Sequence, residues 1–180
     1  QHDVAEFLQT GEVRQRSADL AGAVLVARGP EPGGIEDVWL LFGAPDRGAV
    51  DLPTVSRSAG DALACPPGQC RAVSDRVPPV LPVPGERLRA IVAAVAAEEP
   101  RTELAFQARW AEEDRYVVRS EWLRLPDTVA VAILGAGEGR STLALYARPQ
   151  FGLLDAGGNR ARLERWLDRI EGLARAEAAR

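Results

Sequence analysis

The chain has 180 residues, of which 46% are hydrophobic and 27% charged, and its formal net charge is −4 at pH 7. This composition is typical of one globular domain with a hydrophobic core and excludes a wholly disordered chain. Apart from His2, every basic residue is an arginine, and the arginines are interleaved with Glu and Asp. Because nucleic-acid binding draws on a concentrated positive face, we do not expect a nucleic-acid partner.

In the N-terminal third of the chain, the apolar residues follow no clear helical or strand periodicity. Residues 1–60 are expected to form an irregular segment, and residues 61–180 an α+β core domain that carries the cysteine loop. The segment contains two apolar patches, at 20–27 and 38–42. Neither approaches the ~18 apolar residues that span a bilayer. Both patches suit a segment that anchors the domain or binds a partner.

The two cysteines lie close together in Cys65-Pro-Pro-Gly-Gln-Cys70. A pair separated by a Pro-Pro-Gly turn closes a small disulfide loop if the two Cβ vectors face each other. Free thiols are the main alternative. A metal site is disfavoured because His2 is the only histidine and there is no second cysteine pair. A structural disulfide would place the protein in an oxidising compartment, the bacterial envelope.

In the second half of the chain, the apolar residues recur at clear helical and strand spacings. Apolar residues at helical spacing predict a helix from Pro84 to about Glu98. Four segments with strand periodicity follow, at 102–107, 116–123, 128–134 and 141–147.

The glycine-rich stretch 135–139 joins the last two strands as a hairpin turn, because it leads into no helix that could hold a phosphate. An amphipathic helix ends the chain, and Asn159 is its expected N-cap. The predicted fold is therefore α+β: a four-stranded antiparallel meander with two helices on one face, preceded by the irregular N-terminal segment.

No catalytic constellation stands out. A Ser-His-Asp triad would depend on His2 near the terminus, and a Ser-Lys pair is impossible because the chain has no lysine. The carboxylate pairs, such as Glu98-Glu99, lie at the ends of elements, where a solvated loop is the ordinary interpretation. We therefore predict a protein that is not an enzyme and has no cofactor and no metal. A carboxylate-only enzyme is the remaining catalytic alternative.

Polar residues gather around the ends of the predicted strands and the start of the last helix. Arginines and an aspartate from these places are expected to converge near one end of the sheet. Two interpretations stay open: a buried ion-pair network that holds the loop 148–158, or a site for an anion or a lipid head group. The candidate residues are Arg119, Ser120, Asp127, Arg148, Asp155, Asn159 and Arg160.

The same residues carry a resemblance. Residues 146–164 resemble the signature of the bacterial family called domain of unknown function 1499. Residues 62–70 are similar to the cysteine motif of the alphaproteobacterial branch of this family. Residues 119–120, together with 125–127, are similar to the middle motif of the family. The match covers about residues 40–173.

The chain departs from the family signature at Ala147 and Leu154, where serines are usual, and at Gln150, where a second arginine is usual. These departures make the loop less polar, so an anion site there would be weakened or structural. The resemblance implies an envelope location, because members often carry a signal peptide or a membrane segment. It implies no activity.

Two functions follow as expectations. The first is an accessory or scaffold subunit, periplasmic or membrane-associated, that interacts with a protein of a membrane-associated complex. The second is a small helix-grip-like carrier, in which the sheet and the last helix would enclose a lipid or another apolar ligand. The apolar side chains of the sheet would line that cavity or simply fill the core.

Overall fold

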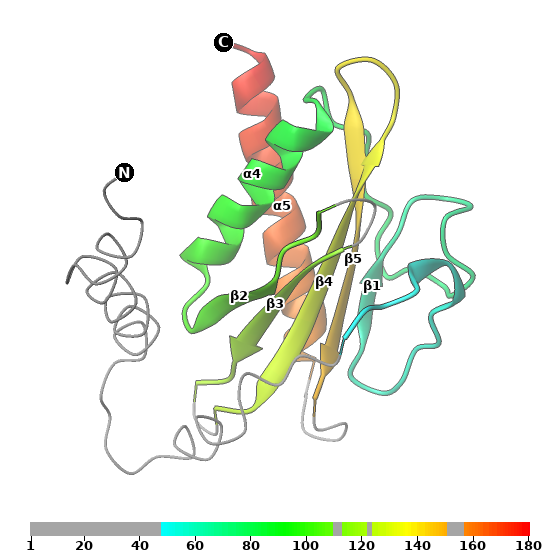
Figure 1. The fold of residues 1–180 in the computed structure, drawn as a ribbon, viewed down its shortest axis with the longest axis vertical. Coiled ribbons are helices and arrows are strands. Elements are labelled where there is room, and N and C mark those ends of the chain that lie inside the picture. Colours follow the sequence, from blue (N-terminus) through cyan, green and yellow to red (C-terminus); the bar gives the residue numbers. More distant parts are fainter. Residues whose placement is uncertain (1–47, 110–112, 122–123, 151–156) are drawn as a thin grey trace, which may run out of the picture. The chain divides into compact units, whose positions relative to one another are not determined.

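The structure is a computed structural model that describes residues 48–109, 113–121, 124–150 and 157–180 (Figure 1). The apolar patches predicted within residues 1–47, and the candidate site residue Asp155, lie outside the described residues. The described elements are η1 (Leu52–Thr54), β1 (Ala62–Ala64), α4 (Gly85–Glu98), β2 (Thr102–Phe106), β3 (Asp114–Arg119), β4 (Pro126–Gly135), β5 (Ser141–Pro149) and α5 (Gly158–Ala178).

An antiparallel sheet with the order β1-β5-β4-β3-β2 forms the centre of the fold (Figure 1). Strands β2 to β5 are the predicted meander, so the α+β class is confirmed. Strand β1 is a fifth strand that pairs with the outer side of β5, with Leu63 opposite Tyr146. The hairpin turn between β4 and β5 is present, and its residues Gly137 and Gly139 have positive φ angles, which favour glycine.

Both helices cover the same face of the sheet (Figure 1). Alternation along the strands directs every second side chain to this helix face. Tyr116 of β3 meets Trp166 of α5 edge to face, with ring centroids 5.8 Å apart. The core on this face joins both helices to β1, β3, β4 and β5. Its large buried members include Leu88, Val92, Leu143, Leu145, Leu163, Trp166, Leu167 and Ile170.

A second, smaller core lies on the opposite face of the sheet. It forms where the chain before and after β1 packs on β4 and β5, and it includes Val50, Leu52, Leu63, Cys65, Ala130, Ala144 and Tyr146. Over β1, β5 and β4 the sheet is therefore covered on both faces. Val50 and Leu52 precede residue 61, so part of the segment expected to be irregular contributes to this core.

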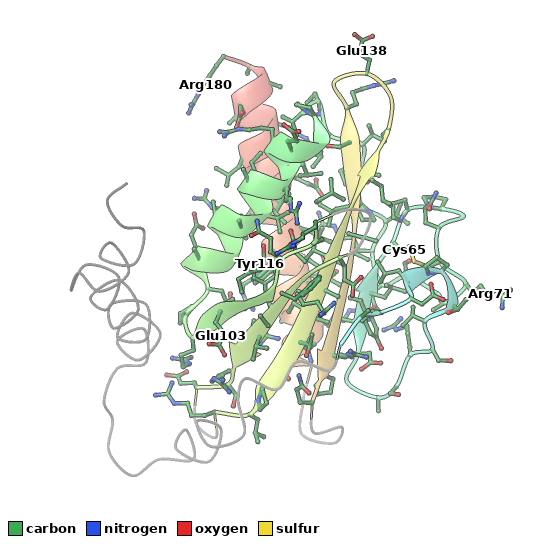
Figure 2. All side chains as sticks on the ribbon, in the orientation of Figure 1. Cys65, Arg71, Glu103, Tyr116, Glu138 and Arg180 are labelled. Atoms are coloured by element: carbon green, nitrogen blue, oxygen red, sulfur yellow. A yellow bond between two sulfur atoms is a disulfide. The ribbon has the colours of Figure 1, made fainter. Side chains whose placement is uncertain are left out.

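The predicted disulfide is present. Cys65 and Cys70 are bonded, and their Cα atoms are 6.3 Å apart, within the usual range for a disulfide. Cys65 is buried in the second core immediately after β1. The loop that contains Cys65 and Arg71 lies at the β1 edge of the sheet, away from the two helices (Figure 2). The disulfide thus ties a short surface loop to the second core.

Candidate functional site

The candidate polar residues that the structure describes are distributed over several places. Asp127 and Asn159 lie on the helix face, whereas Arg119 and Arg148 project from the opposite face, as strand alternation requires. Arg160 is bonded at the β1 edge. The predicted convergence at one end of the sheet is thus divided between the two faces and one edge.

A buried ionic network on the helix face is built around Arg162. Its guanidinium donates to Asp127 Oδ2 at 2.9 Å and to Asn159 Oδ1 at 2.5 Å. It also lies 3.5 Å from Glu99 Oε1, beyond the end of α4. The side chains of Arg162 and Asp127 are only 10% and 12% exposed. This network joins α5, β4 and the end of α4. It differs from the ion-pair network expected around the loop 148–158, because Arg119, Arg148 and Arg160 have other partners.

Asn159 does not cap the last helix. The N-cap is Gly157, whose φ of 88° is left-handed, and Asn159 lies inside the first turn. Its side-chain oxygen accepts from Arg162 instead of from the backbone of the helix. The prediction of Asn159 as N-cap is therefore wrong, because the helix begins one residue earlier and the Asn159 side chain bonds Arg162, its neighbour three residues later on the helix.

Arg160 belongs to a second group at the β1 edge. Its Nη1 lies 3.3 Å from Asp75 Oδ1, and Arg57 Nη2 lies 2.6 Å from Asp75 Oδ2. The same Oδ2 accepts the backbone N–H of Leu63 at 2.9 Å. Asp75 therefore holds the returning chain against β1, and Arg160 adds an exposed contact from the start of α5.

Ser120 has a local role. Its backbone N–H donates to the carbonyl of Leu125 at 2.9 Å, and its hydroxyl oxygen accepts the N–H of Leu125 at 2.9 Å. Both hydrogen bonds connect the end of β3 with the start of β4. The hydroxyl is thus engaged in closing this connection, which is an ordinary use of serine near turns.

The face of the sheet opposite the two helices, which we call the second face, carries arginines on β3 and β5. Arg119 Nη2 donates to Glu103 of β2 at 2.9 Å, and Arg148 Nη2 donates to the carbonyl of Gly48 at 3.3 Å. Between them, the Gln150 amide donates to the hydroxyl of Thr128. This end of the second face is therefore polar, whereas the end toward β1 is the second core.

The tyrosines of the sheet are held neutral by their surroundings. Burial raises the pKa of Tyr116 to about 12, and the nearby charge of Asp114 adds to the shift. Burial also raises the pKa of Tyr146, and the hydrogen bond from its hydroxyl to Asp61 raises it further. Tyr146 points into the second face, so its hydroxyl is a structural donor there.

An exposed apolar strip runs along the β1 edge of the sheet. We call residues 77–84, Val-Pro-Pro-Val-Leu-Pro-Val-Pro, the proline strip. Val77 and Val80 are 58% and 53% exposed, whereas Leu81 and Val83 are buried. Each proline fixes its own φ and disfavours a helical conformation for the residue before it, so the strip is held extended.

Specific contacts hold the proline strip in place. Leu81 and Ser141 exchange backbone hydrogen bonds of 2.7 and 3.1 Å, and the Ser141 hydroxyl donates to the carbonyl of Val83 at 2.7 Å. Just before the strip, Arg76 makes ion pairs with three carboxylates of α5, at Glu164, Asp168 and Glu171. The inward side chains and the backbone are therefore anchored, and the outward valines remain in solvent.

The sequence analysis does not single out this stretch as a binding surface. The sequence does indicate an extended segment here, because four of its eight residues are prolines. What the sequence did not reveal is which side chains of the strip face outward, because that depends on the pairing of Leu81 with Ser141.

Comparisons of the chain with protein-family models, with curated proteins and with solved structures found no match. The resemblance to the domain of unknown function 1499 family therefore stays a prediction. Among the described residues, no helix has both the length and the apolar character needed to cross a bilayer.

Proposed function

We propose that this chain is a non-catalytic accessory domain of the bacterial cell envelope, and that it binds a protein of a membrane-associated complex through the proline strip. The observation that carries the proposal is the exposure of Val77 and Val80 on an extended, anchored backbone. Extended proline-rich segments are recognised by aromatic-lined grooves of partner proteins, because little conformational entropy is lost on binding. The partner is therefore expected to present such a groove.

The packing of the helix face supports this function over the helix-grip carrier. In a carrier, side chains of the sheet and the terminal helix would surround a ligand. Here Trp166, Leu163 and Leu167 of α5 are at most 2% exposed and pack in one cluster with Leu143 and Leu145 of the sheet. The apolar side chains that would line a carrier cavity are thus in contact with one another.

The disulfide supports the envelope location. Cys65 and Cys70 are bonded in a loop whose first cysteine is buried. Structural disulfides persist in oxidising compartments and are rare in the cytosol. The resemblance to an envelope family points in the same direction.

A photo-crosslinking experiment tests the proposed function. A photoreactive amino acid replaces Val77 or Val80, and the matched control replaces Leu104, which is 49% exposed in β2 at the opposite edge of the sheet. The proposal predicts one discrete protein adduct from positions 77 and 80 that is lost when the other strip valine is changed to Asp. An equal adduct from position 104, or lipid adducts alone, would refute it.

A further inference from the structure

Two arginines occupy one face of the sheet at its polar end. In the strand register, Arg119 is opposite Pro126, and Thr128, two residues further along β4, is opposite Arg148. Paired residues share a face, and residues two apart on one strand also share a face. The side chains of Arg119, Thr128 and Arg148 therefore all point to the second face. With strands ~4.8 Å apart and a rise of ~3.4 Å per residue, the two arginine Cα atoms are about 12 Å apart. Two long arginine side chains can converge across that distance.

Each of these arginines has a buried donor that no described residue satisfies. Arg119 uses Nη2 for Glu103, while its Nη1 is buried and has no hydrogen-bond partner among the described residues. Arg148 uses Nη2 for the carbonyl of Gly48, while its Nε is buried and likewise has no partner in the described part of the chain. Buried donors without partners are rare and costly, and a bound anion would supply the acceptors that these two donors lack.

The groups between the two arginines suit an oxyanion. Thr128 is fully buried, and its hydroxyl oxygen accepts from the Gln150 amide, which leaves the hydroxyl hydrogen to donate. Glu103, on β2, is the acidic partner of Arg119, and its side chain is 42% exposed. Among the described residues, these two guanidinium groups pair with one carboxylate, that of half-exposed Glu103, so the described part of this corner has an excess positive charge.

The third arginine of the same face is engaged elsewhere. Arg115 forms an ion pair with Glu113 at 3.1 Å, and its guanidinium carbon lies 4.0 Å from the centre of the Phe106 ring. Glu113 also accepts the backbone N–H of Val50 at 2.8 Å. Arg115 therefore serves the packing of β2 and β3, and the excess charge lies with Arg119 and Arg148.

We propose that Arg119 and Arg148, with the Thr128 hydroxyl between them, bind one phosphate group. Guanidinium groups present paired N–H donors that match the oxygens of phosphate, and the two unsatisfied donors would gain partners on binding. The phosphate can be a free ion or the head group of a phospholipid. This site lies on the second face of the sheet and is independent of the proline strip, so either proposal can fail alone.

The test measures binding of two probes to the purified chain. Inorganic phosphate is titrated by calorimetry, and vesicles of phosphatidylcholine with or without phosphatidic acid are used in a flotation assay. The variants are Arg119→Gln and Arg148→Gln. The control is Arg140→Gln, in the exposed β4–β5 hairpin near Glu138 (Figure 2). Circular dichroism confirms that each variant is folded.

Saturable binding of one phosphate per chain, weakened about tenfold or more by each site variant and unchanged by Arg140→Gln, supports a site for the free ion. Binding to the phosphatidic acid vesicles alone, with the same variant pattern, supports the head group as the source. Binding that survives both site variants overturns the proposal. If the wild-type chain binds neither probe, the proposal is overturned regardless of how the variants behave.

Discussion

Changing Asp127 to Ala removes one partner from the buried network on the helix face and tests whether that network fastens α5 to the sheet. Asp127 accepts from Arg162 at 2.9 Å, and both side chains are at least 88% buried, as their exposures of 12% and 10% imply. Removing one member of a buried ion pair costs about 3–5 kcal/mol, because the other charge is left without compensation. Arg162 keeps Asn159 and Glu99 as partners. We therefore expect the lower end of that range, about 3 kcal/mol.

Urea denaturation followed by circular dichroism measures this loss. For a domain of this size the free energy of unfolding falls by about 2 kcal/mol per molar urea. A loss of about 3 kcal/mol in that free energy therefore lowers the urea midpoint of unfolding by about 1.5 M. The matched control is Glu98→Ala. Glu98 also bonds an arginine of α5, Arg169, through two contacts of 2.9 Å, but both of those side chains are about half exposed. Exposed pairs contribute little, so this midpoint is expected to stay near that of the wild type.

A double substitution separates the stability contributed by the Asp127–Arg162 ion pair from the cost of leaving one of its charges unpaired. Asp127→Leu with Arg162→Met removes both charges and keeps apolar volume, so it is expected to be closer to the wild type in stability than Asp127→Ala. Glu99 then keeps its bonds from Arg165 at 3.0 Å and from the Trp166 indole at 3.4 Å. Equal midpoints for Asp127→Ala and Glu98→Ala would show that the network does not fasten α5, and the reasoning would fail.

Three further predictions follow from other contacts. Reducing the Cys65–Cys70 disulfide should lower the free energy of unfolding by about 2 kcal/mol on the loop-entropy model, measured as the urea midpoint with and without reductant; an unchanged midpoint would contradict this. The chain's two tyrosines, Tyr116 and Tyr146, should ionise well above the ordinary pKa of 10.0 while the domain is folded, in a spectrophotometric titration against the urea-unfolded chain. Because the folded pKa of Tyr116 is raised, its contribution to stability is complete below pH 10 and is lost as the pH rises toward about 12; a folded-state midpoint near 10 would refute the burial argument. The hydrogen bond from Arg169 lowers the pKa of Glu98 below its usual 4.5, so an NMR titration should show that Arg169→Gln returns it toward that value; a titration that is the same in both proteins would exclude this cause.

The parts of the fold that the sequence predicted are those with a long, regular apolar period. Leu88, Val92 and Val95 mark one face of α4, and the nearly continuous apolar run of β4 marks a central strand. Strand β1 was missed because Ala62–Ala64 is three residues long, is buried throughout and therefore shows no alternation. Its identity as a strand rests on pairing with β5, more than 80 residues later in the chain, which a local pattern does not contain.

The candidate site was predictable in its residue types but not in its grouping. Alternation indicates that Asp127 and Thr128 point to opposite faces, yet only the packing of α4 and α5 decides which face is covered by helices. For that reason Asp127 joins Arg162 under α5, whereas Arg119 and Arg148 share the other face. Arg162 itself resembled one more surface arginine of an amphipathic helix, and its burial became visible only in the tertiary structure.

The central claim is that the domain binds a protein partner on its surface while its own side chains fill its interior. Native mass spectrometry of the protein, extracted gently from its own membranes and then denatured for lipid analysis, tests this most directly. The account predicts a stoichiometric complex with a second protein, which dissociates when Val77 and Val80 are both changed to Asp. A chain without a protein partner that carries an apolar ligand and releases it only on unfolding would contradict the account and favour the carrier.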